Sequence, residues 1–533
     1  MGNERSSTKT ICGQEDASSS GWLLTSVRVA NLSLLTITIA RTAWIGDDAL
    51  ITLRHILNAT HGWGPSFNVT ESVLGATHPL WMLLWMGAGS ITDSWILSNF
   101  IMSICFSVFA AALILWSAQS VSVVIGASLA LILSSAYIDY STSGLENPLA
   151  MALVGLLILQ SRAQRNLTPI LAMVLGLSAA AVILTRADLL LIVLPALLHV
   201  LLRWRRRIDL ILIGLASSFL PLAVWSAWSW STFSSLVPNT FAAKSNVAVP
   251  RAELLVQGMR YLQVTLGHDW GTALVLIFGG AVVAALGSRW SRLWLLGVFN
   301  YLLYVVWVGG DFMAGRFLAI PVYVVVFLVT LLSSRLRSFG RASTHGKSVW
   351  GGAALLIVVM IAAAAPTPTA LTRDPGERWD ESFGIVDERG FYANWGRTLH
   401  VFILEDGDGP PFQFRSIADS NPGVGSLAEF DSAARSWPER ENPQEELPSD
   451  VGLVCWLGAT AVLSGPTVHW IDRCALTDRF LAEITFTETD WRIGHFERDI
   501  PQGYLEAIRA NDAEQVEDPE LRRELKHLWS RIR

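Results

Sequence analysis

A succession of long apolar runs constrains the fold of this 533-residue chain more than any other feature of its sequence. A helix needs roughly 17–25 apolar residues to cross the hydrocarbon core of a bilayer. Hydrophobic residues make up 52% of the chain and charged residues only 16%, against about 25% in soluble proteins. We therefore expect a polytopic α-helical membrane protein with about eleven spans, near residues 22–40, 95–116, 120–136, 148–160, 168–184, 189–202, 208–230, 271–287, 292–308, 316–333 and 348–366.

The basic residues between these runs indicate which side of the membrane each loop occupies. Cytoplasmic loops carry an excess of Lys and Arg. If the apolar stretch 77–91 is an interfacial helix and not a span, all the basic clusters fall on one side. These clusters are Arg162 and Arg165; Arg203, Arg205, Arg206 and Arg207; Arg289 and Arg292; and Arg335, Arg337, Arg341 and Lys347. The pattern predicts a cytoplasmic tail over residues 1–21, a transmembrane domain over 22–366 and an extracytoplasmic C-terminus.

The composition changes after about residue 367, where prolines and charges become frequent. Residues 367–533 are predicted to form a soluble extracytoplasmic domain of mixed α/β structure, long enough to hold its own core. Cys455 and Cys474 either form a disulfide in that compartment or remain two unpaired buried thiols. Asp518 is placed to cap a terminal helix. The elements expected in this domain are strands over 451–457 and 461–471 and the terminal helix over 519–532.

Polar residues suited to chemistry gather in the loops of the opposite, extracytoplasmic side. The largest of these loops, residues 41–94, contains the adjacent pair Asp47 and Asp48 directly after the first span. A charged side chain at the end of a membrane span is energetically costly unless it faces a cavity, a partner or water. Adjacent positions do not share one face of a helix or strand. We therefore expect one carboxylate to face a reacting centre while the other binds a partner.

Several roles for the pair stay open from the residues alone. A carboxylate can act as a base or a nucleophile, and Asp47 or Asp48 could hold a divalent cation together with a donor phosphate. The alternatives are a helix cap, since Asp is favoured at helix N-termini, or a structural ion pair with Arg41 or Arg54. No P-loop, dinucleotide, zinc or Ser-His-Asp signature appears, and no cofactor is certain. The net charge of −6 gives no indication of a nucleic-acid partner.

Two short motifs place further charges at the predicted outer ends of spans. Glu146 belongs to the motif Thr-Ser-Gly-Leu-Glu-Asn-Pro at 142–148, where helix capping explains the Asn-Pro pair but not Gly-Leu-Glu. Arg186 and Asp188 stand between two spans with no loop to solvate them. They either pair with each other, or Arg186 holds a phosphate.

Two longer outer segments complete the set. Asn239 and Lys244 lie in a long loop, where a Lys is a suitable point charge for a phosphate but is more often only solvated. Asp311 and Arg316 are the only charges of Gly-Gly-Asp-Phe-Met-Ala-Gly-Arg-Phe at 309–317. The glycines allow a tight turn or the close approach of a ligand. A turn alone needs neither charge, so this segment favours a functional role.

Together these motifs resemble the terminal β-(1→2)-arabinofuranosyltransferases of mycobacterial-type cell walls. The resemblance implies a GT-C-like fold in the plasma membrane, with an extracytoplasmic active site. It implies decaprenylphosphoryl-arabinofuranose as the lipid donor and the arabinan of arabinogalactan or lipoarabinomannan as the acceptor. It also implies that a β-linked donor gives a β-linked product, so that base and nucleophile both stay open for the Asp pair. The matching segments are 44–54, 58–73, 142–146, 238–244 and 309–317, with 468–478 and 491–504 in the tail.

The lipid donor restricts where its phosphate can bind. The phosphate has to lie at the outer membrane boundary, because its polyprenyl tail stays in the bilayer. An Arg there can hold it through two parallel hydrogen bonds. The candidate phosphate ligands are therefore Arg54, Arg186, Lys244 and Arg316, with Arg186 and Arg316 favoured. The candidate catalytic residues are Asp47 and Asp48, and the candidate substrate-binding residues are Glu71, His78, Glu146, Asn239 and Asp311.

Other functions remain open at this stage. The chain could transfer another sugar, such as mannose, from a polyprenyl phosphate. It could also be a non-catalytic membrane scaffold or motility protein that kept the fold. A transporter would need polar residues at mid-bilayer depth, whereas the charges here lie mostly at one face. The aromatic residues of 367–533 either stack on the acceptor sugar or form the core of that domain.

Overall fold

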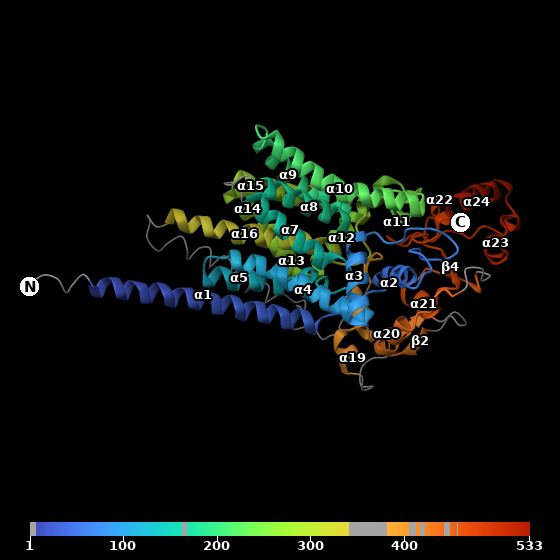
Figure 1. Ribbon diagram of the computed structural model, residues 1–533, viewed down its shortest axis with the longest axis horizontal. Coiled ribbons are helices and arrows are strands. Elements are labelled where there is room, and N and C mark those ends of the chain that lie inside the picture. The colour runs from blue at the N-terminus through green and yellow to red at the C-terminus, as the bar shows by residue number, and fades with distance from the viewer. Residues whose placement is uncertain are drawn as a thin grey trace, which may run out of the picture.

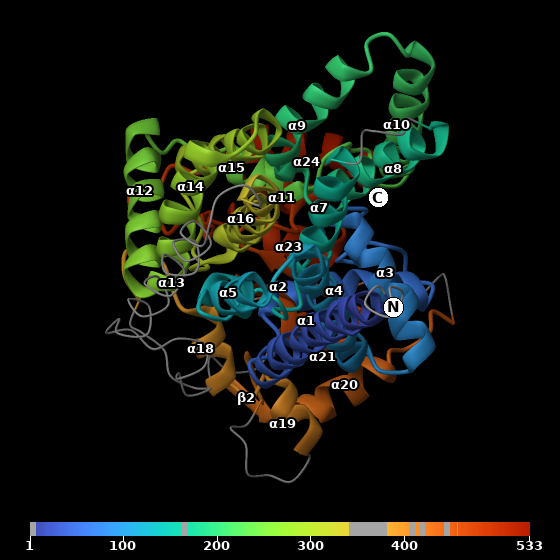
Figure 2. The same ribbon diagram turned by 90° about the vertical axis from the view of Figure 1, so that its left-hand side faces the viewer.

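The computed structural model describes residues 7–162, 168–340, 381–404, 412–415, 422–441, 448–455 and 457–533. Most of this part of the chain is helical, and the longest helices lie side by side along the long axis of the molecule (Figure 1). Figure 2 looks down the same bundle from one end. The bundle helices are α1 (Ser7–Arg41), α4 (Trp95–Ser117), α5 (Val121–Ile132), α7 (Asn147–Arg162), α8 (Pro169–Thr185), α9 (Leu190–Arg203), α10 (Ile208–Phe233), α12 (Arg251–His268), α13 (Trp270–Leu274), α14 (Gly280–Leu286), α15 (Arg289–Trp307) and α16 (Ala319–Gly340).

Every predicted span except one falls on helical structure. The exception, 348–366, lies outside the described residues. In the part of the chain that the structure describes, four helices are long and apolar enough to cross a membrane, or five if a pair bent by 108° counts as one span. The four are Gly21–Arg41, Trp95–Ser117, Ile208–Phe233 and Arg316–Ser333, and the bent pair is Arg251–His268 with Trp270–Leu286. The structure thus confirms a helical protein with apolar spans, while the count of eleven stays a prediction.

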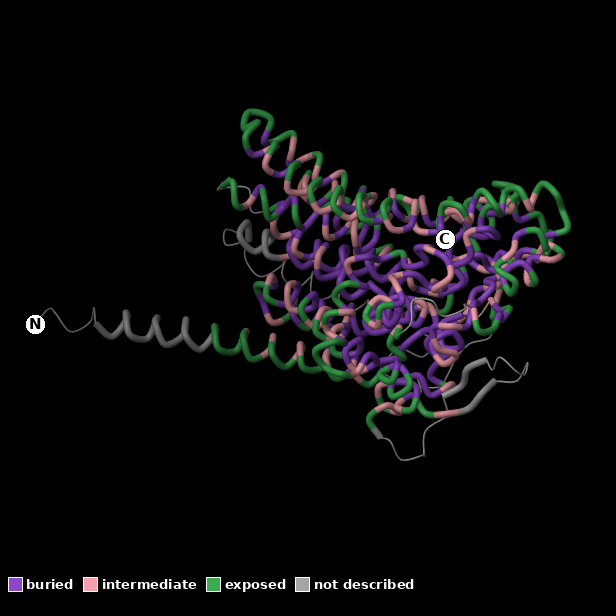
Figure 3. The backbone as a smooth tube through the Cα atoms, turned by 45° about the vertical axis from the view of Figure 1, so that its right-hand side comes forward, coloured by how far each residue is buried: buried purple, intermediate pink, exposed green. Residues whose placement is uncertain are grey.

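The outer helices expose apolar side chains, as expected for residues that face lipid. On α10, Phe219 and Leu220 are each 67% exposed and Trp230 is 58% exposed. Buried residues gather along the centre of the molecule, and exposed residues follow its outer helices (Figure 3). Soluble proteins rarely leave a large contiguous apolar surface in water. The exposed face of α10 therefore supports a location in a bilayer.

The two ends of the bundle differ in character. The connections from α9 to α10 and from α14 to α15, and the C-terminal end of α16, lie at the left-hand end of Figure 1, opposite the C-terminal residues. The basic residues of 203–207 lie at the first of these connections, and Arg289 and Arg292 lie in the first turn of α15, directly after the second. Two of the four basic clusters that the sequence assigns to the cytoplasm thus share one end of the bundle. The orientation of that end in a membrane stays a prediction.

The first loop and the C-terminal residues pack together at the other end. α2 (Asp47–Thr60) lies against α21 (Gly458–Leu463), and α3 (Pro79–Thr92) packs on α4. Their apolar side chains share one core, in which Trp44 and Leu53 join Ala459. The sequence predicts a C-terminal domain with its own core, whereas the structure builds much of that core jointly with the first loop. The domain boundary at 366 lies outside the described residues.

Two pairs of short strands occur in the described C-terminal residues. β1 (Phe412–Arg415) pairs antiparallel with β2 (Pro422–Gly425), and β3 (Asp450–Val454) pairs parallel with β4 (Val468–Asp472). β3 confirms the first predicted strand. The second predicted strand, 461–471, is wrong in its first part, because 458–463 form α21. The small side chains of α21 allow it to approach α2 closely, which a single-sequence pattern does not reveal.

The remaining C-terminal helices are short, except for the last. Cys455 and Cys474 form a disulfide that joins the end of β3 to the loop after β4. Asp518 caps the terminal helix by accepting hydrogen bonds from the amides of Glu520 and Leu521, as predicted. The helices are α18 (Glu388–Asn394), α19 (Leu399–Leu404), α20 (Leu427–Arg435), α22 (Arg479–Glu483), α23 (Tyr504–Ala510) and α24 (Pro519–Ile532).

Candidate active site

Asp47 and Asp48 open α2 but face different parts of the molecule. The Asp47 side chain is 10% exposed and accepts hydrogen bonds from Arg397 Nη1 at 2.9 Å, the Gly458 amide at 2.7 Å and the Ala459 amide at 3.0 Å. These amides open α21, where a carboxylate is stabilised by the N-terminal end of the helix. Asp47 therefore joins the first loop to the C-terminal residues.

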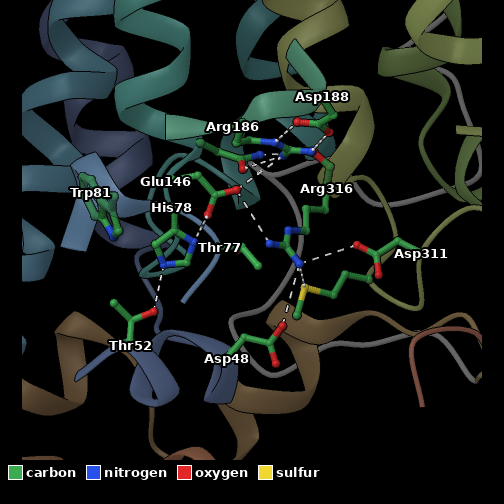
Figure 4. A network of polar contacts seen from close by, with 12 residues as sticks. Asp48, Thr52, Thr77, His78, Trp81, Glu146, Arg186, Asp188, Asp311 and Arg316 are labelled. Carbon is green, nitrogen blue, oxygen red and sulfur yellow. Dashed lines mark hydrogen bonds and ion pairs between the residues drawn. The ribbon is translucent and has the colours of Figure 1, made fainter. Parts of the chain in front are cut away.

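Asp48 points instead toward Arg316 (Figure 4). The shortest distance between its Oδ2 and Arg316 Nη1 is 3.7 Å, and its side chain is 33% exposed. Burial raises the pKa of the Asp48 carboxyl above its ordinary value, and the charges of Arg316 and Lys244 only partly offset this increase. Of the predicted catalytic pair, Asp48 is thus the carboxyl that remains open to a ligand.

Arg316 lies among three carboxyl groups without a close hydrogen bond to any of them. Its guanidinium is 3.7 Å from Asp48, from Asp311 and from Glu146. Its Nη1 contacts the sulfur of Met313 at 3.6 Å, and its Nε has no hydrogen-bond partner among the described residues. Charge-assisted hydrogen bonds of Arg are normally about 2.7–2.9 Å long. The guanidinium therefore keeps donors with which it can bind an anion.

Glu146 is the central carboxylate of this network. Its oxygens lie 3.2 Å from His78 Nδ1, 3.6 Å from Arg186 and 3.7 Å from Arg316. Burial would raise the pKa of Glu146, but the charges of His78, Arg316 and Arg186 together lower it below its ordinary value. Thr52 fixes the other side of the His78 ring through a contact of 2.8 Å to Nε2. Glu146 thus stays ionised and orients cations and His78 around it.

The turn before Glu146 depends on Gly144. Gly144 has φ +83°, and an added Cβ would lie 2.7 Å from side-chain atoms of Ala49 and Ile45. Its carbonyl accepts hydrogen bonds from Trp81 Nε1 at 3.0 Å and from Asn99 at 3.1 Å. The glycine that capping does not explain is therefore required by this left-handed turn, which lies against Ile45 and the first turn of α2.

Arg186 is held by its own neighbours. Its Nε and Nη2 donate to Asp188 at 3.1 and 2.6 Å, its Nη1 donates to Asn147 at 3.2 Å, and its Nη2 also donates to Tyr301 at 3.0 Å. The pairing with Asp188, which the sequence leaves as the alternative, is therefore present. Asn147 donates in turn to the carbonyl of Arg316 at 3.1 Å. Arg186 is placed to position Glu146 and Arg316 more than to bind an anion.

Three glycines shape the loop that carries Asp311. Gly309, Gly310 and Gly315 have φ values of +90°, +78° and +84°, and a Cβ on Gly310 would lie 2.4 Å from Tyr261. One oxygen of Asp311 accepts a hydrogen bond from the amide of Phe312 at 2.9 Å, and the other faces Arg316. The glycine-rich motif thus forms a tight turn and also presents its two charges to the network.

Three of the predicted site residues lie elsewhere. Arg54 is fully buried and donates to the carbonyls of Phe67 and Val468, each at 2.8 Å, and to the carbonyl of Ala461. Glu71 accepts from Asn68 at 3.3 Å, and burial raises its pKa to about 8. Asn239 donates to carbonyls of the C-terminal residues. Each of the three is thus bound by protein groups within the joint core, and their roles in binding the donor phosphate (Arg54) and the substrate (Glu71 and Asn239) stay predictions.

Lys244 and Arg397 complete the charged surroundings of the Asp pair. Lys244 is exposed on α11 (Asn239–Ser245) and lies close enough to Asp48 to lower its pKa. Arg397, the partner of Asp47, is missed by sequence reasoning. No local pattern connects these residues, since 350 positions separate them in the chain. Thr52 and Tyr301 are missed for the same reason.

The described residues do not form a ready-made metal site at Asp48. The one group of three close potential ligands in the described part of the chain is Cys455, Asp472 and Cys474, and its two cysteines are bonded to each other. Asp48 and Asp311 both face Arg316, which already supplies a positive charge between them. The predicted divalent cation would thus have to draw most of its ligands from the donor phosphate and water, and we derive no step through it.

Comparisons with known proteins bear out the resemblance seen in the motifs. No protein-family model matches the chain. A terminal beta-(1->2)-arabinofuranosyltransferase of Mycobacterium tuberculosis is 29% identical over 426 residues, which cover 68% of this chain and 64% of that protein. A Corynebacterium glutamicum protein of the same name is 26% identical over 440 residues, covering 69% of this chain and 57% of that protein. The chain thus spans less than two thirds of the length of either relative.

Among solved structures, ArnT from Cupriavidus metallidurans bound to undecaprenyl phosphate is similar with a TM-score of 0.45 and 12% identity. The similarity covers 65% of this chain and 72% of ArnT.

Proposed function

We propose that the protein is a membrane glycosyltransferase that moves arabinofuranose from decaprenylphosphoryl-arabinofuranose to the non-reducing ends of arabinan, forming terminal β-(1→2) links. The observation that carries the proposal is the placement of Arg316. It opens the apolar helix 316–333, keeps unused donors, and lies 3.7 Å from the open carboxylate Asp48. A lipid phosphate needs a cation at the end of a span. The names of the two relatives support the choice of sugar and link.

In this proposal the donor phosphate binds Arg316 while its polyprenyl tail lies along the apolar helices. Bidentate binding would replace the three long ion pairs with shorter charge-assisted hydrogen bonds. Lys244 adds a mobile positive charge beside Asp48. Arg186, together with Asn147, fixes the backbone and the carboxylate that surround Arg316. The two arginines thus have different roles: Arg316 binds the phosphate, and Arg186 positions Arg316.

The transfer breaks the bond between the anomeric carbon and the phosphate oxygen and forms a bond to an acceptor hydroxyl oxygen. The hydroxyl proton has to leave, and the lipid phosphate departs as an anion. Asp48 is the carboxyl placed to act, either as the base that accepts this proton or as a nucleophile that holds the sugar transiently. Its partial exposure leaves room for a substrate next to Arg316.

A polar groove between α12 and the C-terminal loops supports a site for the acceptor. The groove has a volume of about 990 Å³, and Arg492 and His495 line it. Both side chains also contact the ring of Phe312, which follows Asp311 in the chain. Aromatic faces and charged groups together suit a hydroxyl-rich glycan. They include Phe383, Trp491, Glu253, Arg260, Glu381 and Asp490. Tyr392 and Trp470 are instead buried, so the alternative of a structural core holds for those rings.

An extracytoplasmic active site agrees with the disulfide. Disulfides persist mainly in oxidising compartments, and the Cys455–Cys474 bond lies just after β3 and β4, of which β4 is at the same end of the molecule as α2 (Figure 1). Cysteine labelling in intact cells tests the orientation. A reporter cysteine within 203–207 should stay unlabelled by an impermeant reagent, and one within 231–270 should react. The reverse pattern would contradict the proposed site.

The decisive experiment is transfer by the purified full chain in lipid vesicles. Synthetic decaprenylphosphoryl-arabinofuranose and a short arabinan should give a product with one added β-(1→2)-linked residue, and Asp48→Asn should abolish most of it. Transfer only from a mannosyl or other lipid donor would keep the enzyme class and remove the proposed sugar. No transfer from any polyprenyl-phosphate sugar would contradict the function and favour a scaffold.

A further inference from the structure

The segment 385–399 crosses the candidate site and is tied to the loop of Asp311 at its first end. The amide of Val386 donates to the carbonyl of Phe312 at 2.8 Å. The carbonyl of Val386 accepts from the amide of Ala314 at 3.1 Å. This backbone pairing places the residues after Val386 directly beside the Asp311 turn.

The second end of the same segment is tied to the start of α2. The amide of Ile45 donates to the carbonyl of Arg397 at 3.0 Å, and the Arg397 side chain contacts Asp47 at 2.9 Å. Between the two ends, the ring of Tyr392 stacks on Trp44 with a centroid distance of 6.0 Å. The first turn of α18 is therefore held between the Asp311 turn and the Asp pair.

Glu388 is the carboxyl that this first turn brings into the site. It is 7% exposed, and its Oε2 has no hydrogen-bond partner among the described residues. It is not needed as a helix cap, because Asp387 accepts the amide hydrogen bond of Gly390 at 3.1 Å. A buried carboxyl oxygen without a partner is unfavourable. Because no described residue binds Oε2, this position is suited to a partner from outside the chain.

The charges around Glu388 favour its neutral form. Burial and, to a smaller extent, the carboxylates of Asp48, Asp311 and Asp47 raise its pKa against the charge of Arg492, and the net pKa is about 8. The ionisable groups that act on Glu388 or respond to its charge are Asp47 and Asp48 of α2, Asp311, Arg492, Tyr140, and Tyr392 of α18. Near pH 7 Glu388 therefore carries a proton that it is able to donate.

We propose that Glu388 is a further active-site residue, whose protonated carboxyl forms a hydrogen bond with a sugar hydroxyl held beside Asp48 and Asp311. This inference rests on the proposed function for the identity of the sugar, a pentose of either the lipid donor or the glycan acceptor. A further carboxylate at this point would repel the donor phosphate, whereas a neutral carboxyl binds a hydroxyl and adds no charge. When the pH rises through the range in which Glu388 ionises, the carboxyl loses the hydrogen bond that it donates and gains a negative charge that repels the phosphate.

Three variants of the full chain in vesicles test this role. Glu388→Gln keeps a neutral polar group, so transfer at pH 7 should stay within about threefold and should no longer decline above about pH 8. Glu388→Ala should reduce transfer about tenfold or more. Glu506→Gln, an exposed site on α23, is the matched control and should keep the wild-type pH profile. Melting temperatures at each pH separate lost transfer from unfolding.

Infrared difference spectra of wild type minus Glu388→Gln give a readout that does not depend on transfer. A neutral carboxyl band should be present at pH 7, disappear above about pH 8, and change frequency on addition of a short arabinan or of the lipid donor. The ligand that shifts the band identifies which sugar Glu388 contacts.

Several results would overturn the proposal. These are an inactive but folded Glu388→Gln, unchanged transfer by Glu388→Ala, an alkaline decline that survives in Glu388→Gln, absence of the neutral band, or a band that neither ligand shifts. A wild type that transfers no sugar contradicts the proposed function instead, and the infrared spectra still decide the state and contact of Glu388.

Discussion

The two sides of the first turn of α2 show how adjacent carboxylates acquire different tasks. On one side Asp47 is bonded to Arg397 and to the amides that open α21. On the other side Asp48 forms, among the described residues, a single ion pair of 3.7 Å, to an arginine whose own donors are not all used there. The hydrogen-bonding capacity of Asp47 is therefore used within the fold, whereas the carboxylate of the neighbouring Asp48 is available to a ligand.

The same contrast holds for the two arginines. Arg186 donates from all three guanidinium nitrogens to the protein, whereas no carboxylate in the described part of the chain lies closer than 3.7 Å to Arg316. Saturated groups stabilise the fold, and unsaturated groups in the same network are free to bind a substrate. Partner geometry, and not residue type, thus separates structural from functional charges in this molecule.

The largest expected effect concerns activity. Asp48→Asn should reduce transfer by roughly 10²–10⁴-fold, the range for loss of an acid–base group. The free energy of unfolding should change by less than about 1 kcal/mol, because the Asp48 pair is long and partly exposed. Initial rates in vesicles and denaturant titrations measure the two quantities. A folded Asp48→Asn variant with wild-type rates would remove Asp48 from the site.

The matching change on the other side should act on stability. Asp47→Ala leaves Arg397 and two buried amides without their carboxylate, so the free energy of unfolding should fall by about 3–5 kcal/mol. Thermal unfolding of the purified chain with lipid checks this. If Asp47→Ala instead melts like the wild type and loses only transfer, the contrast between the two carboxylates fails.

A third test compares the arginines. Arg316→Lys removes the bidentate geometry and should weaken the use of donor by about 1.5–3 kcal/mol, the scale of a charge-assisted hydrogen bond, with acceptor binding unchanged. Arg186→Lys should mainly lower the melting temperature, because it breaks several buried hydrogen bonds. Rates over a range of donor and acceptor concentrations distinguish the two. Unchanged donor dependence in a folded Arg316→Lys variant would make Arg316 a structural partner of its carboxylates.

The smallest expected effect is a displacement of the pH profile. Lys244 lowers the pKa of Asp48 against the larger effect of burial. Lys244→Met should therefore move the acidic limb of the transfer rate to higher pH, by less than about one unit because the side chain is exposed. High salt should weaken the difference between this variant and the wild type. A shift to lower pH would show that Asp48 does not control this limb.

Local sequence patterns are enough to predict the helical membrane class, the terminal helix with its cap, and the segments that meet at the site. Apolar runs and helix caps are local patterns, because membrane insertion of a helix and capping of its end depend on residues that are close in sequence. The sequence motifs also single out Asp48, Glu146, Asp311 and Arg316, which the fold brings together. Their charges stand out because they interrupt apolar surroundings.

Which of these charges already have hydrogen-bond partners is visible only in the folded chain. Arg54 has carbonyl partners that lie 407 and 414 positions away, and Asp47 has amide partners more than 400 positions away. Glu388 carries no motif, and it became a candidate only because backbone pairing at both ends of its segment holds it near Asp48 and Asp311. Whether a polar group has all its hydrogen-bond partners depends on residues that are far apart in sequence, and a local pattern does not encode such contacts.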